Sequence, residues 1–330
     1  IGFESTAHYA LNLELFLENA HHSFMEVNPV LIKEYKKSTT LRRTKTDSVD
    51  CESIARWLIT VEYKPHSKGF YHAYSLKSLT RLRDRLIRQR SFYLVKITNV
   101  LDHTFPEFKP FFNERLSKTA LYLLENYGSA EKMARMNSAS YDKLRCISRG
   151  KFSIQQFLRL KELAANTVGV NNSIFDLELN TLLTLYKSLS DEINTLETEI
   201  IKLIEEVHPH YMSIPGIGPI SAAVIYAEYG DISNFSNPGQ MLAFAGIEPG
   251  INDSGTESHG GRMVKHGSSQ LRYVLLNACL PLIRFDLTFA TYYEKKRAEG
   301  KKHRVAITHV AKKLIRVIYA LERQDVDFNA

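Results

Sequence analysis

The segment LLTLYKSLSDEINTLETEIIKLIEEV, residues 182–207, decides the architecture of the middle of this chain. Apolar residues recur in it every seven positions, in the two offsets that form the a and d positions of a coiled coil. One series is Leu182, Leu189, Leu196 and Leu203, and the other is Tyr186, Ile193, Ile200 and Val207. The pattern predicts a coiled coil or an antiparallel helical hairpin. Its partner is either residues 78–104 of the same chain or a second chain.

The charge around this segment is unevenly distributed. The 330-residue chain has a net charge of +7, but residues 181–240 carry −6 and residues 61–120 carry +7. The basic charge peaks in KSLTRLRDRLIRQRSFYLVK, residues 77–96, which holds seven Lys and Arg against one Asp. Four of these cations share one face of a predicted helix: Lys77, Arg81, Arg85 and Arg88. We interpret this face as a surface for nucleic-acid phosphates, and a solvated helix face is the alternative.

The cysteines and the hydropathy exclude several classes of protein. Cys51, Cys146 and Cys279 lie far apart and form no CxxC pair, which argues against a disulfide framework and a zinc ribbon. No apolar run approaches the roughly 18 residues of a membrane span. We therefore expect a reduced, cytoplasmic protein. Because the chain begins at Ile1 inside a strand-like stretch, without a Met, we also expect the natural chain to start earlier.

The amino-terminal residues predict a small α/β unit. Residues 1–6 and 22–28 are rich in β-branched and aromatic residues, and a helix is predicted over 9–19 between them. This βαβ arrangement implies a parallel pair of strands. Glu4 lies near the carboxyl end of the first strand, where open α/β sheets place functional groups.

Asp47 and Asp50 lie three residues apart at the start of a predicted helix, so their side chains share one face. One interpretation is helix capping by Asp47, with Asp50 favoured by the helix dipole. The other is a Mg²⁺ site completed by Glu4, since converging carboxylates beside cations are typical of phosphodiester cleavage. The neighbouring cations are Arg42, Arg43 and Lys45.

Residues 214–232, IPGIGPISAAVIYAEYGDI, predict a helix-hairpin-helix. Gly216 and Gly218 bracket an apolar residue before a helix, an arrangement that can hold a DNA phosphate at the helix amino terminus. A simple tight turn is the alternative.

Residues 250–280, GINDSGTESHGGRMVKHGSSQLRYVLLNACL, form a glycine-rich loop followed by a helix predicted to begin near Ser269. Ser254, beside Gly255, is a candidate nucleophile, although most serines in such loops are turn formers. The nearby cations are candidate nucleic-acid ligands: Arg262, Lys265 and Arg272. His259 and His266 are candidates for proton transfer, with an ordinary exposed histidine as the alternative. The basic tail, residues 294–323, is amphipathic, and we expect it to cover a core and lie along nucleic acid.

Six features follow one another along the chain: GFESTAHY, KTDSVDCESIARWL, the basic helix, the heptads, IPGIGPISAAVI and LAFAGIEPGINDSGTESHGG. In this order they resemble the DEDD transposases of the IS110 group, which are relatives of the Piv/MooV DNA invertases. The resemblance implies an α/β RNase H-like (RuvC-like) domain, here incomplete, then an all-α coiled-coil section and a mainly α transposase domain. It also implies recombination of DNA, in part of the group guided by a non-coding bridge RNA. By motif match, Glu4, Asp47 and Asp50 are three of four Mg²⁺-binding acids, and Ser254 becomes joined to DNA.

The family's first acid lies in a GxDxxK-like strand, whereas this chain has no Asp before Asp47. We therefore expect a fragment or a decayed gene, with impaired metal binding. The expected domains are residues 1–75 (truncated RuvC-like), 76–207 (basic helix and coiled coil) and 208–330 (transposase domain with the helix-hairpin-helix and serine loop). The heptads imply a homo-oligomer, a dimer or tetramer. Two rival functions stay open: a Holliday-junction-type nuclease that uses water, and a non-catalytic nucleic-acid-binding relic.

Overall fold

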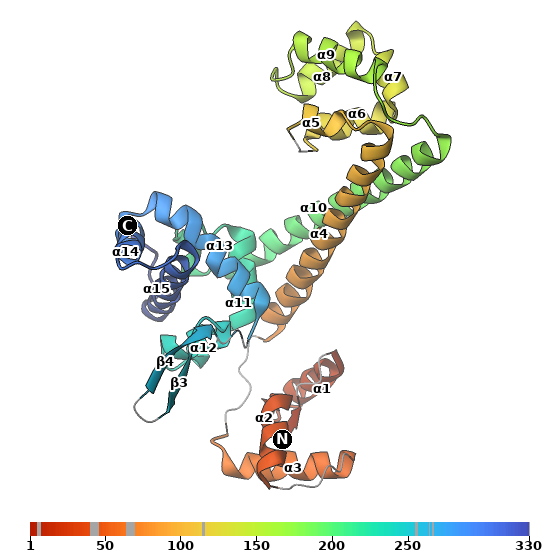
Figure 1. Cartoon of the computed structure of the whole chain (residues 1–330). Coiled ribbons are helices and arrows are strands. Elements are labelled where there is room, and N and C mark those ends of the chain that lie inside the picture. Colours follow the sequence, from red (N-terminus) through yellow and green to blue (C-terminus); the bar gives the residue numbers. More distant parts are fainter. Residues whose placement is uncertain are drawn as a thin grey trace. The chain divides into compact units, whose positions relative to one another are not determined.

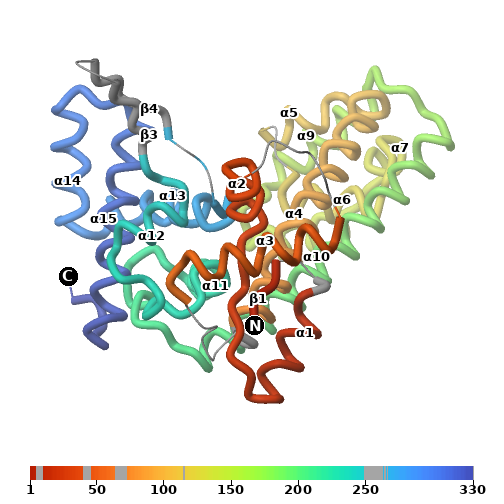
Figure 2. The backbone as a smooth tube through the Cα atoms, turned by 90° about the horizontal axis from the view of Figure 1, so that it is seen from below, coloured from red at the N-terminus to blue at the C-terminus, as the bar shows by residue number. Residues whose placement is uncertain are grey.

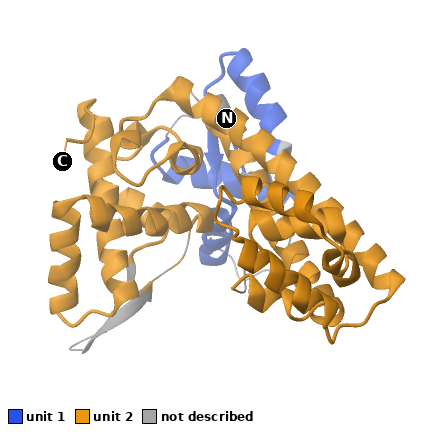
Figure 3. Ribbon diagram, turned by 90° about the horizontal axis from the view of Figure 1, so that it is seen from above, with its two compact units in different colours: residues 1–70 blue, residues 71–330 orange. Residues whose placement is uncertain are grey.

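The computed structural model describes residues 1–4, 8–39, 46–63, 70–113, 116–254, 257–263, 265 and 267–329. For residues 8–9, 70–72, 249–254 and 257–262 only the backbone is described. The chain divides into two compact units, residues 1–70 and 71–330, which are coloured separately in Figure 3. The finer division at residue 207 stays a prediction.

The first unit contains a parallel strand pair covered by helices. Its elements are β1 (Gly2–Glu4), α1 (His8–Asn19), β2 (Met25–Val27), α2 (Pro29–Thr39) and α3 (Asp47–Thr60). Strands β1 and β2 pair in parallel, with Glu4 opposite Val27, so the predicted βαβ arrangement is confirmed. Helix α3 packs on β1, where the Leu58 side chain lies against Gly2. Of the RNase H-like sheet that the resemblance implies, the described residues of this unit form only these two strands.

The second unit is built on two long helices, α4 (Phe70–Thr104) and α10 (Ser173–Val207). They run side by side as a long arm (Figure 1). The start of α4 packs on the end of α10, because Leu76 shares a core with Ile200. At the other end of the arm, the end of α4 packs on the start of α10, because Ile97 shares a core with Leu179. The arm is therefore an antiparallel hairpin, one of the two predicted arrangements, and residues 78–104 supply the partner helix within the chain.

Heptad burial agrees with this packing. Ile193 and Ile200 are buried, and the remaining a and d residues of the heptads are half-buried. Between the helices, the Arg83 Nε donates to Glu197 Oε1 at 2.7 Å. At one end of the arm, five shorter helices surround a second core: α5 (Phe108–Phe111), α6 (Lys118–Tyr127), α7 (Ala130–Ala134), α8 (Ser138–Ile147) and α9 (Ile154–Ala165).

The carboxy-terminal part packs at the other end of the arm. Its helices and strands are η1 (His210–Ser213), α11 (Pro219–Tyr229), η2 (Ile232–Asn234), α12 (Pro238–Ala245), β3 (Pro249–Ser254), β4 (Glu257–Met263), α13 (Ser269–Phe285), α14 (Leu287–Ala298) and α15 (His303–Gln324). Helices α11, α13 and α15 supply most of its core, and α14 runs beside α15 (Figure 2). The predicted tail helix, α15, buries its apolar face there.

Within the described residues, no single helix is both long and apolar enough to cross a membrane. Only α13 and α14 together meet the length and composition requirements, and they are bent by 106°.

Candidate functional site

The start of α3 positions two of the three predicted acids. Thr46 caps this helix, because its side chain accepts the Val49 N–H at 3.4 Å. Asp47 is therefore the first helical residue, and it is exposed. The expectation that Asp47 itself caps the helix is wrong, since Thr46 already accepts that N–H. Both acids of the first turn still lie where the helix dipole favours negative charge.

Asp50 already has a cationic partner. Lys36 Nζ, from α2, forms an ion pair with its carboxylate. Glu4, the third predicted acid, is the last residue of β1. Among the described residues, no three His, Cys, Asp or Glu side chains are gathered closely enough to hold a metal ion. As described, these acids do not fit Mg²⁺, and the metal site stays a prediction. Arg42, Arg43 and Lys45 lie outside the described residues.

Glu14 is a functional-group candidate that the sequence analysis missed. Its side chain, on α1, is 2% exposed, and its Oε2 has no hydrogen-bond partner among the described residues. Burial, together with the nearby carboxylates of Glu26 and Glu18, raises the pKa of Glu14 to about 7. The signal in the sequence is an acid in the middle of the apolar run LNLELFL.

The turn before α11 is the place of the predicted phosphate-binding hairpin, whose role stays a prediction. Gly216 has a φ of +96°, and a Cβ there would lie 2.6 Å from Pro281 Cγ, so the backbone can pass α13 only with glycine. Gly218 is exposed and occupies the N-cap of α11, with Pro219 following. Because no side chain caps this helix, its first N–H groups are available to an anion.

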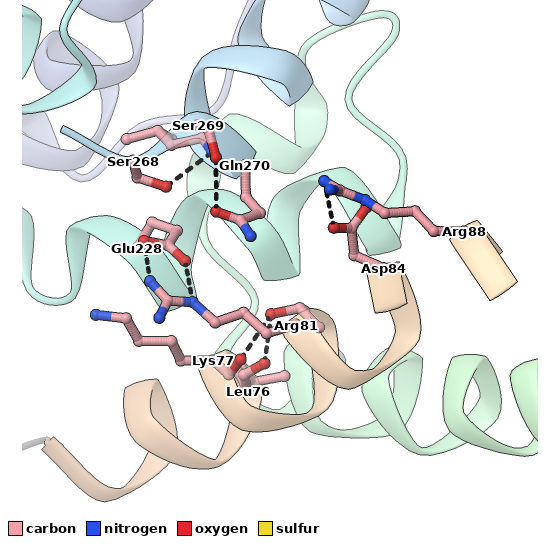
Figure 4. A network of polar contacts seen from close by, with 11 residues as sticks. Leu76, Lys77, Arg81, Asp84, Arg88, Glu228, Ser268, Ser269 and Gln270 are labelled. Carbon is pink, nitrogen blue, oxygen red and sulfur yellow. Dashed lines mark hydrogen bonds and ion pairs between the residues drawn. The ribbon is translucent and has the colours of Figure 1, made fainter. Parts of the chain in front are cut away.

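The basic face of α4 is partly committed to ion pairs (Figure 4). Arg81 donates to Glu228 of α11 through Nε at 3.0 Å and through Nη2 at 3.1 Å, and Glu228 is only 4% exposed. Arg88 reaches back to Asp84 at 2.9 Å. Lys77 and Arg85 pair with no carboxylate of the described chain. Glu228 was missed in the sequence, although an acid inside the apolar helix ISAAVIYAEY requires a cation.

The predicted serine loop is an antiparallel β-hairpin made of β3 and β4. Ser254 is the last residue of β3 and lies opposite Glu257, so the backbone places it at the tip of the hairpin. The side chains of Ser254, Arg262 and His259, and the whole of Gly255 and His266, lie outside the described residues. The glycine-rich composition concealed these strands, because glycine and serine blur the alternation that indicates a strand.

Two predicted cations frame the start of α13, whose N-cap is Ser268. Lys265 is exposed, with a φ of +55°. Arg272 Nη1 donates to the Ala245 carbonyl at 3.0 Å and so holds the carboxyl end of α12. One of its five N–H donors is thus used within the protein, and the others face no carboxylate of the described chain.

Two family models match the chain in order. One, described as a transposase and built for the DEDD type of IS110, matches residues 1–106, and the other, the transposase IS116/IS110/IS902 family, matches residues 209–294. The second match includes the turn before α11 and the β3–β4 hairpin.

Individual relatives are similar over longer stretches. The chain is 28% identical over 237 residues to an uncharacterized 43.6 kDa protein of insertion element IS110 from Streptomyces coelicolor, covering 69% of this chain and 58% of the relative. It is 28% identical over 298 residues to an uncharacterized 42 kDa protein of insertion element IS900 from Mycobacterium paratuberculosis, covering 84% and 71%. It is 25% identical over 260 residues to a transposase for insertion sequence element IS1111A from Coxiella burnetii, covering 78% and 59%. The chain thus spans less than two thirds of the length of the relatives from IS110 and IS1111A.

Proposed function

Because this chain belongs to the IS110 family of transposases, we propose that it cuts and rejoins DNA strands in the transposition of an insertion sequence, with Ser254 as the nucleophile. One observation carries the proposal. The two family models match in the same order as the two parts of the chain that hold the candidate acids and the candidate serine. We expect the protein in the cytoplasm, where chromosomal DNA is accessible.

In the proposed reaction, the Ser254 hydroxyl attacks the phosphorus of the scissile phosphodiester. A bond forms between the serine oxygen and phosphorus, the bond from phosphorus to the 3′-oxygen breaks, and the hydroxyl proton passes to that leaving oxygen through a base or water. The phosphoserine keeps the phosphodiester, so a second 3′-hydroxyl can displace the serine and rejoin the strands without ATP.

The backbone position of Ser254 supports this role. A residue at the tip of a two-stranded hairpin can approach a DNA strand with little of the chain around it. Arg262 on β4 and Lys265 just after it would offset the negative charge that grows on phosphorus in the transition state. The family implies a divalent metal such as Mg²⁺, but no step of the proposed reaction is assigned to it, because the acids as described do not fit one.

The proposed DNA contacts outside the hairpin come from the helical framework. Gly216 and Gly218 would present the first N–H groups of α11 to a phosphate. Lys77 and Arg85 remain as cations of the basic helix that have no carboxylate partner in the described chain, so they would contact the backbone of DNA or of a bridge RNA. A dimer or tetramer through the heptad helices completes the proposal.

A specific observation favours a second candidate, the non-catalytic nucleic-acid-binding relic. No three acids of the described chain are gathered for a metal, and Asp50 is paired with Lys36. The products formed from an element-end duplex separate the possibilities. A covalent protein–DNA adduct supports the serine mechanism, free 5′-phosphate ends support a nuclease that uses water, and binding without cleavage supports the relic.

A further inference from the structure

The turn that joins α14 to α15 carries a concentrated cluster of cations. Residues 295–304, KKRAEGKKHR, hold six Lys and Arg against one Glu. We call these ten residues the basic corner. They lie within the basic tail, residues 294–323, that the sequence predicts to lie along nucleic acid, and none of them belongs to the site residues of the proposed reaction.

Contacts within the corner fix its backbone. Lys296 Nζ pairs with Glu299 at 2.9 Å, and Arg297 Nη1 donates to the Lys301 carbonyl at 2.9 Å. The Tyr293 hydroxyl lies 2.7 Å from His303 Nδ1, which ties α14 to the first residue of α15. These contacts hold the backbone of the corner, so binding would cost entropy mainly in the exposed side chains.

Four of its cations are left without an anionic partner. Lys295, Lys301, Lys302 and Arg304 are all exposed, and in the described part of the chain none pairs with a carboxylate. The basic helix α4 differs, because carboxylates there pair with Arg81, Arg83 and Arg88.

The stability of the fold explains only part of this placement. Cations in the last turn of α14, such as Lys295, complement the helix dipole. Lys301, Lys302 and Arg304 lie instead at the start of α15, where the dipole disfavours positive charge, and no acid of the first turn of α15 offsets them. Two lysines of the corner also act on a neighbouring histidine. The pKa of His309 is lowered, first by burial and then by Lys312, Lys296 and Lys301, although Glu299 opposes this.

We propose that the basic corner, through Lys295, Lys301, Lys302 and Arg304, binds the phosphodiester backbone of a nucleic-acid duplex. This site is separate from the helix-hairpin-helix and from the serine hairpin. The inference rests on the proposed function for the presence of nucleic acid. Three of these cations are lysines, whose ammonium groups are point charges on flexible stems, and the fourth is an arginine, whose guanidinium can bind a phosphate through two N–H groups. We expect the site to hold a duplex in place through its phosphates. DNA and double-stranded RNA share this chemistry.

The test measures how salt weakens binding to the full chain. A variant with Lys295→Gln, Lys301→Gln, Lys302→Gln and Arg304→Gln is compared with the unchanged protein. The control removes the same number of exposed cations from α6, α7 and α8 by Lys118→Gln, Lys132→Gln, Lys143→Gln and Arg145→Gln. Fluorescence anisotropy with labelled 20-base-pair DNA and RNA duplexes gives the affinity between about 50 and 200 mM salt. Urea unfolding checks that both variants are folded.

Loss of four phosphate contacts should reduce the slope of log affinity against log salt by about 3 to 4 for DNA in the corner variant, with little change in the control. A reduction with both duplexes, or with one alone, supports the proposal and identifies which nucleic acid binds. An unchanged slope with both duplexes overturns it, and so does an equal reduction in the control. If the unchanged protein binds neither duplex, the proposed function fails as well. If the unchanged protein transfers DNA strands but the corner variant has an unchanged salt slope, the proposed function stands and only the proposal for the basic corner is wrong.

Discussion

Arg81 of α4 and Glu228 of α11 form a bidentate ion pair, with Nε–Oε1 at 3.0 Å and Nη2–Oε2 at 3.1 Å. The pair joins the helical arm directly to the helix that follows the candidate phosphate-binding turn. Glu228 is buried, so its carboxylate depends on the Arg81 guanidinium as its charge partner.

Arg81→Ala should lower the free energy of unfolding by about 2 to 4 kcal/mol, because it leaves a buried carboxylate unpaired. Arg81→Leu combined with Glu228→Met, which replaces both partners by apolar side chains, should recover most of the lost stability. Arg88→Ala, which breaks an exposed pair within one helix, serves as the control and should cost less than about 1 kcal/mol. Urea unfolding measures all three. Equal effects of Arg81→Ala and Arg88→Ala would contradict the buried pair.

Glu14 makes the stability of the first unit depend on pH. Its pKa of about 7 in the folded state lies above the ordinary value of 4.5, so the folded state favours the protonated form. Below pH 4.5 the burial of Glu14 does not reduce the free energy of unfolding of this unit. That free energy falls as the pH rises through about 7. Glu14→Gln should remove this loss, which reaches no more than about 3 kcal/mol. Hydrogen exchange of α1 in the full chain, measured at several pH values, reports it. Identical pH profiles of variant and unchanged protein would contradict the burial of Glu14.

Gly218→Ser separates helix stability from phosphate binding. The serine side chain can cap α11 and occupy N–H groups that a phosphate would use. We expect equal or slightly greater stability and weaker DNA binding. The companion variant, Gly216→Ala, should unfold more easily, because its φ is +96° and the new Cβ would meet Pro281. Urea unfolding and DNA affinity are measured on both. Unchanged DNA affinity of Gly218→Ser would exclude this helix end as a phosphate site.

His210 fastens the carboxy-terminal residues to η1. Its Nδ1 and Nε2 each lie 2.9 Å from the carboxylates of Asp327 and Asp325, which raise its pKa above the ordinary value of 6.5, with Glu322 adding to the effect. The contact therefore contributes stability below pH 6.5 and loses it as the pH rises through the elevated pKa. The backbone N–H of Phe328 donates to Ser213 Oγ at 2.8 Å. As the pH rises through the elevated pKa of His210, the hydrogen exchange of this amide should accelerate by more than the intrinsic pH dependence of exchange. With His210→Asn the extra acceleration should disappear.

The sequence patterns predicted helices and strands better than they predicted which distant residues contact each other. The heptads of residues 182–207 predicted the hairpin because a and d periodicity reports which face of a helix is buried. The βαβ start was predictable because short connections restrict how neighbouring strands pair. The Arg81–Glu228 pair was not, since its residues are 147 apart and neither periodicity nor propensity carries information on such distant partners. The Thr46 cap was missed because Thr46 and Asp47 are both good N-cap residues.

The candidate site was predictable mainly through its resemblance to the family. Spacing alone left Ser254 an ordinary turn former, and Asp50 was expected to face a metal and not the Lys36 ammonium that pairs with it. The hairpin around Ser254 was not predicted, because its strands contain glycine and polar residues in place of an alternating apolar pattern.

The central claim is that Ser254 becomes covalently joined to DNA. The direct measurement is peptide mapping by mass spectrometry of the adduct formed on an element-end duplex that carries a label on the 5′-phosphate side of the cut. We expect a phosphonucleotide on the peptide that contains Ser254, loss of the adduct in Ser254→Ala, and its persistence in Ser258→Ala on the neighbouring strand. An adduct that survives Ser254→Ala, or a nucleotide mapped to another residue, would contradict the assignment.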